Sequence, residues 1–256
     1  MPSPHGQVRI GASGFSYEHW DGIFYPPNLP KARRLEHYSS EFDTVELNNT
    51  FYRLPNEATF DSWNRRAPNG FLFALKLSRY ITHVKLLSDV EESVEVFLRR
   101  AERLGQHLGP ILIQLPPRLH FDIPRLESFL QLCTRDLRWA VEFRHPSWLS
   151  QEAFEMLRHH RVALCIHDLL EQHPWEITAP FVYVRYHGPS GHYSGDYPPQ
   201  HLRTDATHLA QLSARGLDVY AYFNNDAQGH AVKNARMLKN YLSEAKANRQ
   251  PSSPAR

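Results

Sequence analysis

The chain has 256 residues, of which 41% are hydrophobic and 22% charged, and its 29 Lys and Arg against 27 Asp and Glu give a formal net charge of +2. This composition excludes an intrinsically disordered chain, and the near-neutral balance gives no general reason to expect a polyanionic partner. The two cysteines and the absence of any apolar run near roughly 18 residues exclude a disulfide framework and a membrane helix, so we expect a cytoplasmic protein.

Eight short runs rich in β-branched and aromatic residues have the character of buried strands. They follow one another about every 30 residues, which is the length of a βαβ unit. In chain order the expected strands are residues 8–13, 43–48, 71–76, 111–115, 139–143, 162–168, 181–187 and 218–224. Helical patterns lie between them at residues 57–66, 89–107, 124–133, 151–160, 205–215 and 231–245.

Two of the segments between the strands stand out. The helix expected at 89–107 has the clearest apolar stripe, and Ser88 and Glu91 at its start have the spacing of a capping box. Residues 169–180, in the sixth unit, contain Pro174 and Pro180 and are too few for a full helix, so we expect a loop there.

Strands and helices that alternate without a linker or a change of composition predict an α/β fold, a single (β/α)8 TIM barrel whose sixth helix is short or replaced by a loop. We expect this domain to span residues 1–248. Residues 249–256 are polar and contain proline, and we expect a disordered tail there. A doubly wound open sheet is the structural alternative, since the sequence does not show whether the first and last strands meet.

Polar residues gather at the C-terminal ends of the expected strands. Side chains alternate along a strand, so these polar residues face the barrel interior and their apolar neighbours face the helices. TIM-barrel active sites are built at this end, and we therefore expect a solvated polar pocket there. The polar set is Ser13, Glu46, Asn48, Lys76, Gln114, Glu142, Arg144, His167, Asp168, Arg185, His187, Asn224, Asn225 and Asp226. The alternative is that pairs such as Glu142 with Arg144, or Glu46 with Lys76, are interior ion pairs that only fix the strand register.

Several of these strand ends carry recognisable motifs. They include Val-Glu-Leu-Asn at 45–48, Gln-Leu-Pro-Pro at 114–117, Val-Glu-Phe-Arg-His at 141–145, Val-Arg-Tyr-His-Gly at 184–188 and Tyr-Phe-Asn-Asn-Asp at 222–226. With these motifs in order over almost the whole of residues 8–240, the chain resembles the DUF72 family of YecE-like proteins. The resemblance implies a TIM barrel, in agreement with the strand count. It implies no activity, because the family has no established function.

The polar set predicts an enzyme of hydrolase or isomerase type that acts on a phosphate-bearing or carbohydrate-like ligand. Glu46 and Glu142 are the expected acid/base pair, because a carboxylate beside a cation stays ionised and a more buried one can hold a proton. His187 is the third expected catalytic residue. Cations would bind the anionic group and amides would orient the ligand. The expected ligand-binding residues are Asn48, Lys76, Gln114, Arg144, Arg185, Gly188, Asn224 and Asp226.

Two loops complete this prediction. The segment 188–195 after the seventh strand is rich in glycine, and the loops after strands seven and eight bind phosphate in many TIM barrels. Its first residue, Gly188, is the expected phosphate contact. His83 and His145 lie just beyond the third and fifth strands and are further candidates for proton transfer.

A divalent metal ion is the alternative chemistry, and the cofactor is otherwise undetermined by the sequence. Glu46, Glu142, His187 and Asp226 are suitable ligand types for Mg, Mn or Zn, which would suit a metal-dependent phosphodiester hydrolase. Against a metal, the strand ends carry no His-x-x-x-His pair and three cations share the site.

The other alternative is a binding protein for a nucleotide or nucleic acid, without turnover. Aromatic residues near the first, second and seventh strand ends could stack on bases or sugar rings; they are Phe15, Tyr17, Trp20, Phe24, Tyr25, Phe51, Tyr52, Tyr193 and Tyr197. Support for nucleic acid is weak, because basic residues outside the pocket occur only as pairs and form no track. No feature of the sequence predicts a membrane partner.

Overall fold

Eight parallel strands form the centre of the protein, in a computed structural model that describes residues 5–171, 173–191 and 193–247. The strands neighbour one another in the order β1-β8-β7-β6-β5-β4-β3-β2. Their bounds are β1 Val8–Ala12, β2 Thr44–Leu47, β3 Leu72–Lys76, β4 Leu108–Gln114, β5 Trp139–Glu142, β6 Ala163–His167, β7 Phe181–Tyr186 and β8 Asp218–Phe223. The expected strands are confirmed; the expected tail at 249–256 lies outside the described residues.

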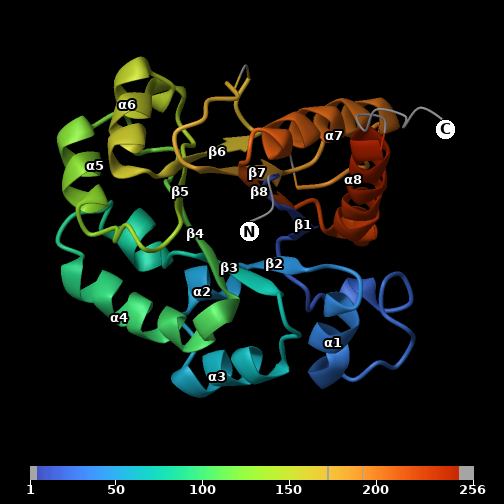
Figure 1. The fold of residues 1–256 in the computed structure, drawn as a ribbon. Helices are drawn as coiled ribbons and strands as arrows, with labels where there is room; N and C mark the ends of the chain where they lie inside the picture. Colours follow the sequence, from blue (N-terminus) through green and yellow to red (C-terminus); the bar gives the residue numbers. More distant parts are fainter. Residues whose placement is uncertain (1–4, 172, 192, 248–256) are drawn as a thin grey trace, which may run out of the picture.

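Helices follow one another around the outside of the sheet in chain order (Figure 1). They are α1 Arg34–Ser39, α2 Asn49–Tyr52, α3 Glu57–Arg66, α4 Glu91–Ala101, α5 Ile123–Leu130, α6 Gln151–His160, α7 Pro199–Ala214 and α8 His230–Ala247. Short helical turns are η1 Glu18–Trp20, η2 Lys31–Arg33, η3 Tyr80–Val84, η4 Glu102–His107, η5 Pro146–Trp148 and η6 Ala227–Gly229. The described residues between β6 and β7 form no helix, which confirms the loop expected in the sixth unit.

The helix expected at 89–107 is only partly correct. α4 ends at Ala101, and η4 continues the chain to Gly105, whose φ of 52° and ψ of −126° break the helical path. The expected capping box is wrong, because the N-cap of α4 is Val90, which has no polar side chain. Ser88 belongs instead to the preceding turn, where its amide donates to the carbonyl of Lys85.

Alternation along the strands separates two apolar clusters. The outer cluster, under the helices, contains residues such as Val45, Val141 and Val184, as the sequence predicts. The inner cluster fills the interior of the barrel below the ends of the strands. It consists of Ala74, Leu112, Ala140, Ala163, Cys165, Phe181, Tyr183, Tyr220 and Tyr222. The interior is therefore packed by this cluster, and the buried charged side chains Glu46, Glu142 and Arg185 lie toward the end where the strands finish.

The barrel closes between β1 and β2, where the backbones come close. A Cβ on Gly11 would lie 2.2 Å from the Thr44 carbonyl oxygen, so this position requires glycine. The buried Tyr38 hydroxyl joins the two strands, because it accepts from the Ala12 amide at 2.7 Å and donates to the Thr44 carbonyl at 3.0 Å. A bridge between Ser13 and Glu46 follows. This seam overturns the alternative of an open, doubly wound sheet, so the fold is TIM-barrel-like.

Within the described ranges, no helix is both long enough and apolar enough to cross a membrane.

Candidate functional site

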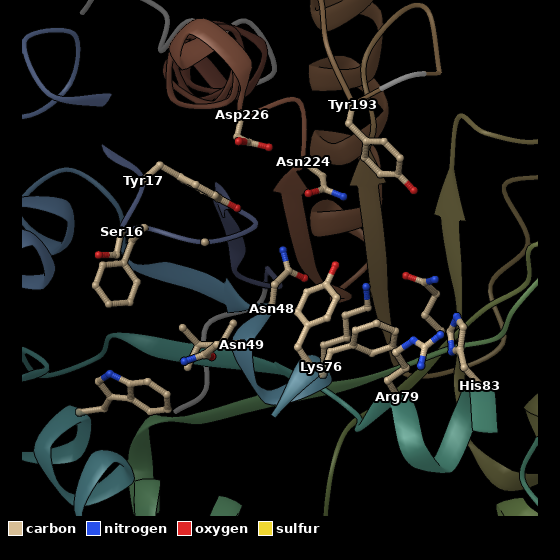
Figure 2. A pocket seen from close by; sticks show the side chains of 17 residues that line it. Ser16, Tyr17, Asn48, Asn49, Lys76, Arg79, His83, Tyr193, Asn224 and Asp226 are labelled. Atoms are coloured by element: carbon tan, nitrogen blue, oxygen red, sulfur yellow. The ribbon is translucent and has the colours of Figure 1, made fainter. Parts of the chain in front are cut away.

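A cavity of about 750 Å³ opens at the C-terminal ends of the strands. Figure 2 shows Asn48 and Lys76 extending into it from one side and Asn224 and Asp226 from the other. Parallel strands end at a common rim, so residues far apart in the sequence meet there. The expected site residues that line the cavity are Asn48, Lys76, Gln114, Asn224 and Asp226.

Beneath this cavity, Arg185 on β7 joins the two expected acid/base residues. Its Nη1 donates to Glu142 Oε2 at 2.5 Å, and its Nη2 donates to Glu46 Oε1 at 2.8 Å. All three side chains have no exposed surface. The structure thus brings Glu46, Glu142 and Arg185 together, but as a buried ion-pair network rather than on the cavity wall.

Both carboxylates are held in the ionised form. Burial favours the protonated acid, but Arg185 and hydrogen bonds from Ser13 and Tyr183 outweigh burial and lower the pKa of Glu46. Arg144 and Arg185 likewise outweigh burial and hold the pKa of Glu142 well below its ordinary value. In this state the two residues accept hydrogen bonds and do not carry a proton for transfer.

His187 lies in the same buried network. Its Nε2 faces the guanidinium groups of Arg185 and Arg144 at 3.2 and 3.3 Å, and its Nδ1 lies 3.2 Å from Asp168 Oδ1. This arrangement suits a neutral ring with its proton on Nδ1. Burial lowers the pKa of His187 to about 4 despite the hydrogen bond with Asp168. The Asp168 carboxylate also accepts from the Tyr197 hydroxyl.

Arg144 connects this network to the cavity. Its Nε donates to Glu142, and its Nη1 donates to the hydroxyl of Tyr193 at 3.0 Å. Tyr193 lines the cavity, whereas Arg144 does not. Through Arg144, the buried network therefore holds the Tyr193 hydroxyl in position on the cavity wall.

Lys76, the last residue of β3, is the expected site residue with the most unusual surroundings. Only 7% of it is exposed, and its Nζ lies 4.1 Å from the centre of the Phe51 ring. Among the described residues no carboxylate oxygen lies within 4.0 Å of this nitrogen and none accepts a hydrogen bond from it. Burial and the charge of Arg185 lower the pKa of Lys76 to about 7, although Glu142 and Glu46 act in the opposite direction.

Two titratable groups of the wall can exchange protons with a ligand. Burial raises the pKa of Asp226 above its ordinary value, while His19, whose Nε2 lies 3.2 Å from Asp226 Oδ2, opposes that shift. His83 packs edge-on against the Phe51 ring, and burial followed by the charge of Lys76 lowers its pKa to about 4. Both groups line the cavity, in contrast to Glu46 and Glu142.

The structure does not bring Gly188 to the cavity. Its amide donates to the Tyr197 hydroxyl at 2.7 Å, so this N–H is not available to a phosphate. Its φ is +102°, and a Cβ at this position would lie 2.2 Å from the carbonyl oxygen of Ser194, so glycine is needed there. Gly188 is therefore needed for the backbone conformation of the turn that follows β7.

The cavity wall also contains residues that the sequence did not predict as site residues. Asn49 begins α2 directly after β2, and Arg79 lies three residues beyond β3. Both residues lie close to the end of a strand, and this position could have indicated them as site residues. The predicted polar set ended at Asn48 on the second strand and at Lys76 on the third, so it did not include them. The others are Gly14, Ser16, Leu47 and Trp63.

The geometry does not favour the metal alternative. Among the residues that the structure describes, no three His, Cys, Asp or Glu side chains are grouped so that they could hold a metal ion. The oxygens of Glu46 and Glu142 are instead engaged by cations and hydroxyl groups, and Asp226 lies apart from them on the cavity wall.

Comparison with known proteins identifies the family. Residues 9–256 match the family described as a protein of unknown function, DUF72. The chain belongs to the DUF72 family. A relative from Bacillus subtilis, the UPF0759 protein YunF, is 28% identical over 92% of this chain and 94% of its own. Resemblance at the strand ends had indicated the same family, and that prediction is confirmed.

Solved structures support the fold. A DUF72 family protein from Thermotoga maritima superposes with a TM-score of 0.81 at 32% identity, over 93% of this chain and 99% of that one. A fusion protein with a xylose isomerase-like TIM barrel superposes with a TM-score of 0.52 at 15% identity, over 98% of this chain and 46% of that one. The second likeness shows the TIM-barrel fold alone and no activity.

Proposed function

We propose that this protein is an enzyme that binds a small phosphate-bearing or carbohydrate-like ligand in the cavity at the strand ends. The observation that carries the proposal is a pair of basic side chains, Lys76 and Arg79, on the wall of this cavity. Neither has a carboxylate within 4.0 Å among the described residues, so both are available to an anion from solution.

The rest of the wall suits a ligand with several hydroxyl groups. Gln114 and Asn224 offer amide donors and acceptors, and Asn48, whose Nδ2 donates to Ser13, offers its Oδ1 as an acceptor. Tyr17 and Tyr193 add hydroxyl groups and ring faces. Sugar rings combine hydroxyl groups with apolar faces, and such a mixed wall is complementary to them.

Hydrolysis and isomerisation both require proton transfer, and here the proposal departs from the roles expected from sequence. Asp226 and His83 line the cavity and serve as acid and base. Glu46, Glu142 and His187 act from below by holding Arg185 and Arg144 in position. They are positioning residues in this proposal.

The aromatic part of the wall supports a second candidate, a nucleotide-binding protein without turnover. Phe15, Tyr17, Tyr52 and Tyr193 line the cavity, and their ring faces could stack on a base. Binding with turnover supports the enzyme; tight binding of a nucleotide that is recovered unchanged supports this candidate.

Calorimetric titration with sugar phosphates, free sugars and nucleotides tests the proposal. We expect a phosphorylated sugar to bind and Arg79→Met to weaken it about tenfold, which corresponds to the loss of one charged contact. Arg99→Met, a change at an exposed arginine that pairs with Glu95 on α4, should leave the affinity unchanged. Failure of every member of the panel to bind, or equal affinity in the Arg79 variant, would overturn the proposal.

A further inference from the structure

Lys76 has features that anion binding alone does not require. It is one of six lysines in the chain, and its amine extends into the cavity (Figure 2). An aromatic ring lies beside it in place of a carboxylate, and its side chain is almost fully buried. An exposed arginine, such as the neighbouring Arg79, binds an anion without this desolvation.

The nearby carboxylates do not hold a proton on this amine. Glu46 and Glu142 form close ion pairs with Arg185, and Glu142 also pairs with Arg144. Both carboxylates still raise the pKa of Lys76, but burial and the charge of Arg185 outweigh them and lower it. Burial and the positive charges of Arg185 and Arg144 favour the neutral amine, whereas the Phe51 ring face, 4.1 Å from Nζ, favours the ammonium form.

We propose that Lys76 is a nucleophile that forms an imine with an aldehyde or ketone group of the ligand. This inference rests on the proposed function, because it assigns the reactive group of a ligand bound in the same cavity. It narrows the substrate class to carbonyl compounds, such as the open-chain form of a sugar or a keto acid.

The step balances without a further reagent. The lone pair of Nζ attacks the carbonyl carbon while the C=O π electrons move to oxygen, which takes up a proton, and Nζ loses one. Departure of this hydroxyl group as water, after a second proton reaches it, leaves a C=N bond between ligand and lysine. Asp226 and His83 on the same wall can supply and remove these protons.

The pKa of the amine supports this chemistry. With a pKa of about 7, about half of the Lys76 side chains are neutral at pH 7, whereas an exposed lysine with a pKa of about 10.4 is neutral roughly once in a few thousand. A neutral amine is the nucleophile in imine formation.

Reductive trapping tests the inference. The purified protein is incubated at pH 7 with dihydroxyacetone phosphate, glyceraldehyde 3-phosphate or pyruvate, reduced with sodium borohydride, and digested for mass spectrometry. We expect one reduced adduct, on Lys76, formed more than about tenfold faster than on Lys31, an exposed lysine that pairs with Glu18. Lys31→Met should leave the adduct unchanged.

Variants and a second measurement keep the outcomes distinct. Lys76→Met and Lys76→Arg should both abolish the adduct, and thermal unfolding checks that each variant is folded. Calorimetric titration with glycerol 3-phosphate, which has no carbonyl group, reports binding separately. Binding of this probe together with no adduct on Lys76 from any carbonyl probe would overturn the imine and leave the proposed function standing. Equal labelling of several exposed lysines would also overturn the imine.

Discussion

The buried amine of Lys76 should destabilise the fold. Its pKa is lowered from 10.5 to about 7, so the unfolded chain binds a proton more readily than the folded one between these values. The free energy by which Lys76 destabilises the fold is largest below pH 7 and decreases as pH rises above 7. We expect Lys76→Met to raise the free energy of unfolding by at least about 1 kcal/mol at pH 6, and by less at pH 9.

Urea unfolding of both proteins at the two pH values measures this effect. Lys85→Met, at a partly buried lysine outside the cavity wall, serves as the control. A lysine needed only for structure would give the opposite sign, with a less stable variant at both pH values.

Arg185 should stabilise the fold, in contrast to Lys76, because it is paired with buried carboxylates. It is fully buried between Glu46 and Glu142, and its removal leaves two buried carboxylates short of a partner. We expect Arg185→Met to lower the free energy of unfolding by about 3–5 kcal/mol. Denaturant unfolding measures the loss, with the exposed Arg99→Met as the matched change; similar stability of the two variants would contradict the prediction.

The sequence predicted which side chains face the barrel interior but not how they pair there. Strand alternation is a local property, and it placed Glu46, Glu142 and Arg185 on the inner face correctly. The pairing of Glu46 and Glu142 with a particular cation depends on which side chain is long enough to contact them across the barrel, and strand alternation does not indicate this. The interior pair suggested for Glu142 and Arg144 forms. The pair suggested for Glu46 and Lys76 does not form at salt-bridge distance, and Arg185 binds both carboxylates instead.

At the scale of the elements, the seam between β1 and β2 depends on one hydroxyl group. The Tyr38 hydroxyl satisfies the amide of Ala12 and the carbonyl of Thr44, both buried. Tyr38→Phe leaves these two groups without their partner, and we expect a loss of about 1–3 kcal/mol in the free energy of unfolding.

Thermal or urea unfolding checks this loss. Tyr52→Phe, at a tyrosine that is 76% exposed, removes a hydroxyl group without burying an unsatisfied partner and should be near neutral. Equal stability of the two variants would show that the seam does not need the bridging hydroxyl.

Strands were more predictable than helix ends. Runs of apolar residues mark buried strands directly, whereas the end of a helix depends on backbone angles that several neighbours set together. Leu86, Leu87 and Asp89 all have positive φ, and this irregular turn removes Ser88 from the N-cap that its spacing with Glu91 predicts. Gly105 ends the helical path after α4 in a similar way.

The whole molecule should lose stability in acid, and His187 is one of the histidines whose burial causes this, with His83 and His173. The pKa of His187 is about 4 in the folded chain and about 6.5 when unfolded, so the unfolded chain gains a proton first as pH falls. The lowered pKa values of Glu46, Glu142 and Asp168 act in the same direction below about pH 4. We expect the free energy of unfolding to fall steadily from pH 7 to pH 4.

Urea titrations at pH 7, 5.5 and 4 measure this dependence. His187→Gln should remove about 1–3 kcal/mol of the change between pH 7 and pH 4, whereas His159→Gln, at an exposed position, should preserve the wild-type slope. A stability that is flat over this range would show that the buried network does not titrate with folding.

The packed inner cluster lies beneath a cavity that opens at the end where the strands finish. The rings of Tyr183 and Tyr222, 5.2 Å apart, belong to the apolar cluster that fills the barrel interior. On the proposed function, a ligand enters and its product leaves at this same end of the barrel, so release precedes the next uptake.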